Sequence, residues 1–158
     1  MRVPTESGSR ITHLSCRSCS YESTPDSTDF PCPDCGGILD PQYDYADVDV
    51  GPEDWESRHG SMWKYRELLP VRDGDAVVSL GEGATPLVDC PGLATELGVG
   101  SVFVKDEGQN PTNTFKDRGQ SVAVSAANEQ DAETVALSSA GNAGQSARAY
   151  AARAGMDC

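Results

Sequence analysis

Four cysteines near the N-terminus restrict the folds open to this chain more than any other feature. They form two Cys-x2-Cys pairs, Cys16/Cys19 and Cys32/Cys35, with 12 residues between the pairs. Each pair places two thiolates on one tight turn, and two such turns complete a tetrahedron around Zn²⁺. The surrounding polar chain has little core of its own, so a bound metal would provide the folding energy that it lacks. The spacing therefore predicts a structural zinc ribbon over residues 1–45.

Two alternatives remain open for this module: a ribbon without metal, and a pair of disulfides. Four cysteines would fill all four coordination positions of the zinc and leave none for a substrate, so catalytic zinc is not expected. His13 lies near Cys16 and could compete as a ligand, although we expect it to be solvent-exposed. Residues 1–45 carry three arginines against seven carboxylates, which argues against nucleic-acid binding by the ribbon.

Charge limits the partners of the whole chain. Its 12 Lys and Arg residues face 25 Asp and Glu residues, a net charge of −13, which repels phosphate backbones and anionic lipid surfaces. No segment approaches the ~20 apolar residues of a membrane span, and the N-terminus has no apolar signal region. We expect a cytoplasmic protein that binds neither nucleic acid nor membranes, with an acidic composition similar to that of proteins soluble in high salt.

The rest of the sequence divides into an arm and an α/β segment. Residues 46–75 are acidic and contain Trp55, Trp63 and Tyr65, which we expect to pack onto the next unit. Residues 76–158 alternate short apolar runs with helical patterns, as is typical of βα units. The predicted fold class is therefore α/β, with a four-cysteine ribbon ahead of a βα-layered domain.

The apolar patterns of that domain predict individual elements. We expect strands at 101–105 and 134–137, with a further strand beginning at 156, and helices at 93–97, 115–130 and 142–154. A parallel sheet with so few strands would be short of core. We therefore expect an incomplete domain, the N-terminal portion of a longer protein.

A lysine at the start of a predicted helix is the first candidate for chemistry. The segment KDEGQNPTNTFKDRG, residues 105–119, places Lys116 where the helix macrodipole disfavours a cation. The same field favours a neutral amine, the form that attacks an aldehyde to make a Schiff base. The alternative is an ordinary surface lysine that pairs with Asp117 or Asp106. For Arg118 we expect a structural ion pair.

The segment LSSAGNAGQ, residues 137–145, is the second candidate. The small residues Ser138, Ser139 and Gly141 allow backbone N–H groups to approach an anion at a helix entrance. The amide of Asn142 can donate to a neighbouring oxygen. The alternative is simple turn chemistry with a helix cap.

Three motifs together resemble a known enzyme family. They are GEGATPL at 81–87, the lysine segment at 105–119, and SSAGNAG at 138–144. In this order they resemble the fold-type II enzymes that depend on pyridoxal phosphate (PLP), most closely the threonine synthases. The four-cysteine ribbon and the sequence WKYRELLP at 63–70 are similar to those of prokaryotic threonine synthases, so the resemblance covers about residues 14–158.

The resemblance implies roles for individual residues. It implies that Lys116 forms the Schiff base with PLP, that Asn142 hydrogen-bonds the 3′-oxygen of the pyridine ring, and that Phe115 packs near the cofactor. Three neighbouring residues are implied to receive the substrate carboxylate: Ser138, Ser139 and the backbone of Gly141.

The family reaction converts O-phospho-L-homoserine and water to L-threonine and phosphate, and the family is expected to form homodimers. A serine or threonine dehydratase on the same fold and a noncatalytic zinc-binding remnant are the alternatives. Asn113 and Thr114 replace the usual Gly-Ser, a change that the backbone tolerates because Asn accepts left-handed angles. The family's glycine-rich phosphate loop is not found in residues 1–158, so we expect this chain by itself to be inactive.

Overall fold

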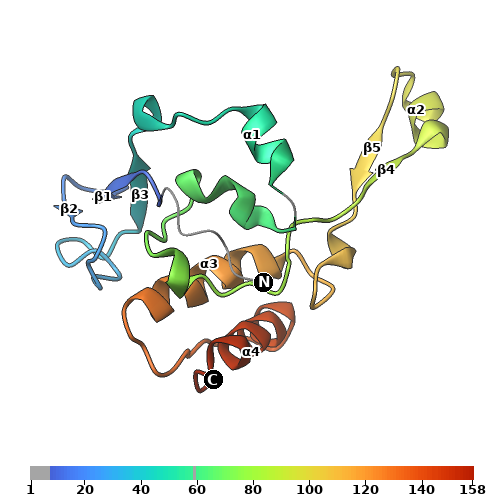
Figure 1. Ribbon diagram of the computed structural model, residues 1–158. Coiled ribbons are helices and arrows are strands. Elements are labelled where there is room, and N and C mark those ends of the chain that lie inside the picture. Colours follow the sequence, from blue (N-terminus) through green and yellow to red (C-terminus); the bar gives the residue numbers. More distant parts are fainter. Residues whose placement is uncertain (1–7, 59) are drawn as a thin grey trace. The chain divides into compact units, whose positions relative to one another are not determined.

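A computed structural model of the chain describes residues 8–58 and 60–158 (Figure 1). The chain forms two compact units, each assembled from separate segments. Among the described residues, the first unit draws on 8–58, 63–77 and 125–133. The second draws on residues 60–62, 78–124 and 134–158. Mixed helices and small sheets make up the molecule, as the α/β prediction requires.

A three-stranded antiparallel sheet in the order β2-β1-β3 forms the ribbon of the first unit. Its strands are β1 (Ile11–Cys16), β2 (Glu22–Ser23) and β3 (Leu39–Tyr43). The strand β1 ends at Cys16, which pairs with Leu39 in β3. The other three cysteines lie in the turns between the strands, so the sheet gathers the two Cys-x2-Cys pairs at one end.

Helix α1 (Pro52–Ser57) follows the ribbon. The Gly51 N–H donates to Asp54 Oδ2 over 2.8 Å, which satisfies one backbone donor at the helix start. Trp55 on this helix packs edge to face with Tyr65, at 5.3 Å between ring centroids.

A buried carboxylate connects two segments of the same unit. Glu67 accepts hydrogen bonds from Arg58 Nη1 at 2.8 and 3.0 Å. The backbone carbonyl of Glu67 accepts the N–H of Arg10, just before β1, over 3.0 Å. The segment around Glu67 is thereby fastened both to the ribbon and to the end of α1.

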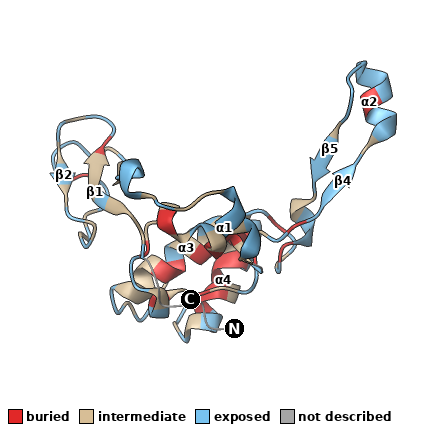
Figure 2. Ribbon diagram, turned by 45° about the horizontal axis from the view of Figure 1, so that its top comes forward, coloured by how far each residue is buried: buried red, intermediate tan, exposed pale blue. Residues whose placement is uncertain are grey.

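The second unit contains a two-stranded hairpin. Strand β4 (Leu87–Asp89) pairs antiparallel with β5 (Phe103–Lys105), with Leu87 opposite Lys105. Helix α2 (Pro91–Leu97) lies in the connection and ends at Gly98, whose φ of 67° is the left-handed angle that closes many helices. The strand predicted at 101–105 is present, although its partner is a local antiparallel strand. Figure 2 shows that both strands are exposed.

The core of the second unit lies between α3 (Lys116–Glu129) and α4 (Asn142–Ala154). Val124 of α3 and Tyr150 of α4 form a buried cluster with Val78. Both helices were predicted within one residue of their ends, and Gly155 closes α4 with a φ of 78°. Few large apolar residues are available for this core, so hydroxyl and carboxylate side chains fill much of the remaining interface.

The strand predicted at 134–137 is reduced to a single parallel bridge. Thr134 pairs with Asp157, and the Val135 N–H donates to the Asp157 carbonyl over 2.8 Å. A parallel ladder depends on several strands covered on both faces, and this segment has one partner residue. The remaining short elements are 3₁₀ turns at Tyr45–Asp47, Met62–Leu68, Gly74–Ala76 and Glu107–Gln109.

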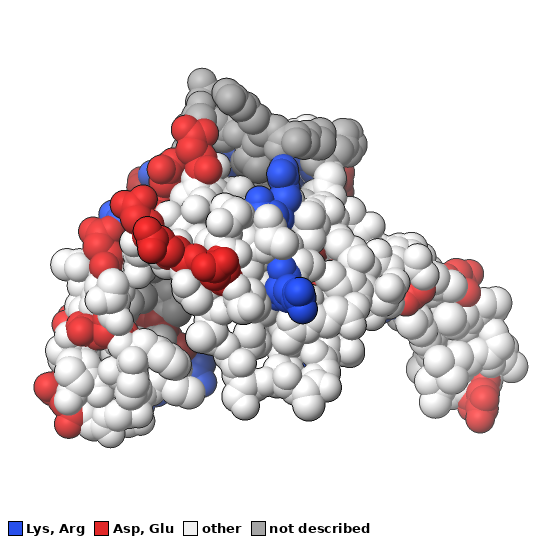
Figure 3. All heavy atoms as spheres, turned by 90° about the horizontal axis from the view of Figure 1, so that it is seen from below, with Lys and Arg blue, Asp and Glu red and all other residues white. Residues whose placement is uncertain are grey.

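Acidic side chains dominate the charged groups of the chain. Figure 3 shows them spread over the face drawn, with basic side chains confined to a few positions. Within the described residues, no helix is both long and apolar enough to cross a bilayer.

Candidate functional site

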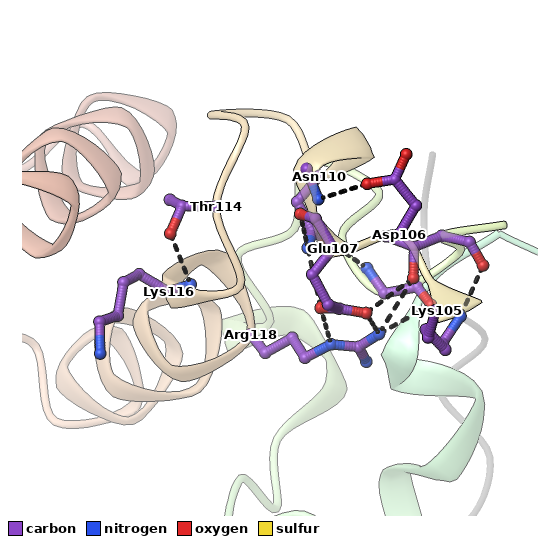
Figure 4. Close-up of polar contacts among 10 residues, drawn as sticks. Lys105, Asp106, Glu107, Asn110, Thr114, Lys116 and Arg118 are labelled. Atoms are coloured by element: carbon purple, nitrogen blue, oxygen red, sulfur yellow. Dashed lines mark hydrogen bonds and ion pairs between the residues drawn. The ribbon is translucent and has the colours of Figure 1, made fainter. Parts of the chain in front are cut away.

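Lys116 occupies the first position of α3. Its backbone N–H donates to Thr114 Oγ1 over 3.3 Å, so the threonine hydroxyl satisfies one backbone donor at the helix start. The Lys116 ammonium lies 4.2 Å from the centre of the Phe115 ring, which is 57% exposed. Figure 4 shows the lysine side chain directed away from Arg118 and Glu107. Within the described residues it forms no ion pair, so the alternative pairing with Asp117 or Asp106 does not occur.

Arg118 forms the structural ion pair expected of it. Its Nε and Nη2 donate to the two carboxylate oxygens of Glu107, each over 2.7 Å. Thr85 Oγ1 and Asn110 Nδ2 donate to the same carboxylate at 2.8 and 3.0 Å. The Arg118 hydrogen bonds, assisted by those from Thr85 and Asn110, lower the pKa of Glu107 to about 2. The positive charge of Arg118 is thus paired with a carboxylate of the same chain (Figure 4).

The same ion pair fastens the GEGATP turn beside α3. The Gly83 N–H donates to Asn110 Oδ1 over 2.9 Å, and the Gly83 carbonyl accepts from Arg118 Nη2 over 3.2 Å. Gly83 has a φ of 89°, and a Cβ there would lie 2.8 Å from Arg118 Nη1. Lys105 Nζ donates to the Thr85 carbonyl over 2.5 Å. Glycine is therefore required at position 83 both by its backbone angle and by the close approach of the guanidinium.

The start of α4 carries the residues of the second candidate segment. Ser138, Ser139, Gly141 and Asn142 are all exposed. The Ser139 hydroxyl oxygen accepts the N–H groups of Gly141 and Gly144, at 3.2 and 3.0 Å. Two amide protons at this helix entrance, those of Gly141 and Gly144, thus have an internal acceptor, although Gly141, the residue that precedes the helix, makes no side-chain cap.

Two hydrogen bonds bring the starts of α3 and α4 together. Ser146 Oγ donates to Asp117 Oδ1 over 2.6 Å, and Gln145 Nε2 donates to the Thr112 carbonyl over 3.1 Å. Lys116 precedes Asp117, and Asn142 begins the helix that carries Ser146. Among the described residues, no hydrogen bond joins the Lys116 side chain directly to the 138–142 segment.

The four N-terminal cysteines converge on one point. Their Sγ atoms all lie within 4.8 Å of one another, and all four thiols are free, so neither disulfide of the alternative interpretation is present. The Ser18 N–H donates to Cys16 Sγ over 3.4 Å and lowers the pKa of that thiol to about 7. A Cβ at Gly37 would lie 2.9 Å from the same sulfur. Four convergent thiols on tight turns are a donor set suited to tetrahedral Zn²⁺.

Comparison with known proteins decides the family. The family model described as "Pyridoxal-phosphate dependent enzyme" matches residues 78–158, the stretch that holds both candidate segments. The chain belongs to the pyridoxal-phosphate-dependent enzyme family. Within this family, the sequence resembles proteins named threonine synthase.

Two archaeal relatives and one cyanobacterial relative show the extent of the likeness. The threonine synthases of Methanocaldococcus jannaschii and Methanosarcina acetivorans are 43% and 41% identical over 145 and 144 residues, which cover 90% and 91% of this chain. That of Synechocystis is 48% identical over 98 residues, which cover 61% of this chain and 26% of the relative. The chain spans 36% and 35% of the length of the two archaeal relatives.

The residues at the two helix starts fit the cofactor of this family. The Lys116 amine is outside any ion pair of the described chain, and the exposed Asn142 amide can donate to a ring oxygen. The Phe115 ring presents an apolar surface beside the amine. When bound, PLP supplies an aldehyde that condenses with an amine and a ring that withdraws electrons.

Two buried carboxylates in this region were not predicted from the sequence. Asp117 was considered only as a partner for charges, and Glu82 only as a residue of the GEGATPL motif. A signal was available in the helical spacing, because Asp117 and Ser121 on one predicted helix, and Ser146 and Tyr150 on the other, are each four residues apart. Such pairs lie on one face of a helix, and here that face is buried.

Proposed function

We propose that this chain carries the cofactor lysine and the substrate loop of a PLP-dependent threonine synthase, which converts O-phospho-L-homoserine and water to L-threonine and phosphate. The observation that carries the proposal is the junction between Asp117 and Ser146, which holds the helix start bearing Lys116 beside the helix start bearing Asn142. The relatives named threonine synthase support the choice of reaction.

Lys116 is the residue proposed to bind the cofactor aldehyde and later to move protons. It occupies the first position of α3, at the end of the helix where the backbone N–H groups point outward. The adjacent Phe115 ring presents an apolar face 4.2 Å from the amine. Asn142 is proposed to orient the cofactor by donating its amide N–H to the 3′-oxygen.

Ser138, Ser139 and the Gly141 backbone are proposed to receive the substrate carboxylate. They are exposed at the N-terminus of α4, where backbone N–H groups and the helix dipole favour an anion. The proposal includes the homodimer expected from the family resemblance and the cytoplasmic location expected from the sequence.

The four-cysteine cluster is proposed to hold one structural Zn²⁺. The convergence of four free thiols within 4.8 Å supports this assignment. Most residues of the turns that connect β1, β2 and β3 are exposed or only half-buried, so the metal would fix those turns in place.

Cofactor attachment can be tested by reduction and mass spectrometry. The protein is incubated with PLP, reduced with borohydride, and digested. We expect a pyridoxyl label on Lys116, and a Lys116→Arg variant should lose it. The chain has only three lysines, so Lys64 and Lys105 report nonspecific labelling in the same sample. Equal labelling of all three lysines would contradict the proposal.

Reaction specificity needs a separate assay. Because residues 1–158 by themselves are expected to be inactive, a chain that also carries the missing glycine-rich phosphate loop is loaded with PLP and supplied with O-phospho-L-homoserine, L-serine or L-threonine. A threonine synthase releases phosphate from the first substrate, whereas a dehydratase forms a 2-oxo acid from the other two. Phosphate release without 2-oxo acid formation is the expected result.

A further inference from the structure

Two carboxylates without exposed surface lie between α3 and α4. Asp117 and Glu82 are each 0% exposed, and within the described residues neither forms an ion pair. A buried carboxylate is costly unless hydrogen-bond donors surround it. The donors that satisfy these two groups come from both helices and from the adjoining loops.

The first carboxylate joins the beginning of α3 to the first turns of α4. Asp117 Oδ1 accepts from Ser146 Oγ over 2.6 Å and from Thr112 Oγ1 over 2.5 Å. Its other oxygen accepts the Thr112 N–H over 2.7 Å. One side chain therefore holds the lysine loop, the start of α3 and α4 together.

The second carboxylate repeats this connection one helical turn further along. Tyr150 Oη donates to Glu82 Oε2 over 2.8 Å, and Ser121 Oγ lies 2.7 Å from Glu82 Oε1. Ser79 and the N–H of Leu80 complete the set of donors. Burial, together with the charge of Glu82, raises the pKa of Tyr150. The phenol therefore keeps its proton and remains a donor throughout the ordinary pH range.

The spacing of these contacts fixes one helix against the other. Asp117 and Ser121 are one turn apart on α3, and Ser146 and Tyr150 are one turn apart on α4. At a rise of about 1.5 Å per residue, the two layers lie about 6 Å apart along each helix. One polar contact would allow the helices to rotate about it, but two successive contacts prevent both rotation and sliding.

We propose that Asp117 and Glu82 act together as positioning residues, a two-layer clamp that sets where the Lys116 amine lies relative to the Asn142 amide. The inference rests on the proposed function for the roles of Lys116 and Asn142. Lys116 immediately precedes Asp117, and Asn142 lies one turn before Ser146. Any slip of α4 along α3 would therefore move the amide relative to the amine by the same amount.

Hydroxyl deletions test the clamp without changing the carboxylates. The variants are Ser146→Ala, Tyr150→Phe and the double variant, with Ser101→Ala and Tyr45→Phe as matched controls at exposed positions. Labelling by PLP and borohydride is measured well below the melting temperature. Since one lost hydrogen bond weakens positioning by about fivefold, we expect the ratio of Lys116 label to Lys64 and Lys105 label to fall about fivefold in each single variant.

A second readout needs no cofactor. Amide hydrogen exchange is followed in residues 112–118 and 142–147, and we expect both segments to exchange about fivefold faster in either variant, whereas the controls match the wild type. An unchanged label ratio in variants that only melt at lower temperature would overturn the clamp. If the wild type shows no preference for Lys116, the proposed function fails. In that case the clamp is tested by amide exchange alone, and an unchanged exchange rate at 142–147 in the variants would refute it.

Discussion

The phenolic hydroxyl of Tyr150 donates a 2.8 Å hydrogen bond to Glu82 Oε2, and neither side chain has exposed surface. The two residues are far apart in sequence, one in the GEGATP turn and the other in the third turn of α4. The carboxylate also meets Ser121 of α3, whose oxygen lies 2.7 Å from Glu82 Oε1 and 2.8 Å from the Val78 carbonyl. A single buried side chain thus organises much of the polar interior of the second unit.

Replacement of Glu82 should distinguish hydrogen bonding from charge. Glu82→Ala leaves the Tyr150 hydroxyl and the Leu80 N–H without a partner, and we expect a loss of about 3–5 kcal/mol in the free energy of unfolding. Glu82→Gln should cost only about 1 kcal/mol, because its amide N–H can donate to Ser121 while the Ser121 proton turns to the Val78 carbonyl. Urea unfolding measures both values, and a glutamine variant as unstable as the alanine variant would show that the charge itself is needed.

The ion pair of Glu107 and Arg118 predicts a specific response to acid. The folded-state pKa of Glu107 is about 2, below the ~4.3 of an unfolded glutamate. The pair therefore contributes its full stability above about pH 4.5, and this contribution is lost as the pH falls from there toward 2. Glu107→Gln should lack that part of the acid sensitivity. Urea unfolding from pH 7 to 3 provides the comparison, with Glu96→Gln on exposed α2 as control, and parallel curves for E107Q and wild type would contradict the expectation.

The two glycines of the GEGATP turn form a matched pair for substitution. Gly81 and Gly83 both have left-handed backbone angles, with φ values of 92° and 89°. A Cβ at Gly81 meets nothing within 4 Å, whereas one at Gly83 would lie 2.8 Å from Arg118 Nη1 and 2.9 Å from Met62 Cβ. We expect Gly81→Ala to cost about 1–2 kcal/mol from backbone strain alone. Gly83→Ala should cost at least about 1 kcal/mol more, from overpacking. Similar losses in thermal unfolding would rule out a tight approach at position 83.

Metal content can be measured directly. We expect about one equivalent of zinc per chain, lost in the double variant Cys16→Ser with Cys35→Ser and kept in Cys90→Ser, whose thiol lies outside the cluster. Chelation should unfold the strands β1 to β3, because the connecting turns have little apolar contact to hold them. A metal-free ribbon with unchanged amide exchange would show that the sheet is stable without zinc.

Local patterns predicted the helices of the second unit well. The ends of α4 and its closing Gly155 follow from helix periodicity and a glycine stop, and α2 similarly ends at Gly98. The convergence of the four cysteines was also predictable, because two Cys-x2-Cys turns at this spacing together form one tetrahedral metal site. The family match and the identity to threonine synthases confirm the resemblance that the three motifs indicated.

Pairing between distant segments was harder to predict. The strand at 103–105 was expected in a parallel sheet, but it pairs antiparallel with β4, where no strand was predicted. Strand propensity indicates which residues adopt an extended backbone, whereas the strand with which they pair depends on tertiary contacts. The burial of Glu82 was missed for the same reason, since its donors come from α3, α4 and its own turn. The roles assigned to Lys116, Asn142 and the 138–141 segment remain predictions.

The Ser139 hydroxyl has one further consequence for the entrance of α4. Its oxygen already holds the amide protons of Gly141 and Gly144. A carboxylate that binds these two N–H groups would have to replace the Ser139 hydroxyl as their acceptor. The N–H groups would then exchange a neutral acceptor for a charged one, which makes hydrogen bonds roughly twice as strong. We therefore expect a negatively charged ligand to displace this hydroxyl from the two amide protons more readily than a neutral ligand does.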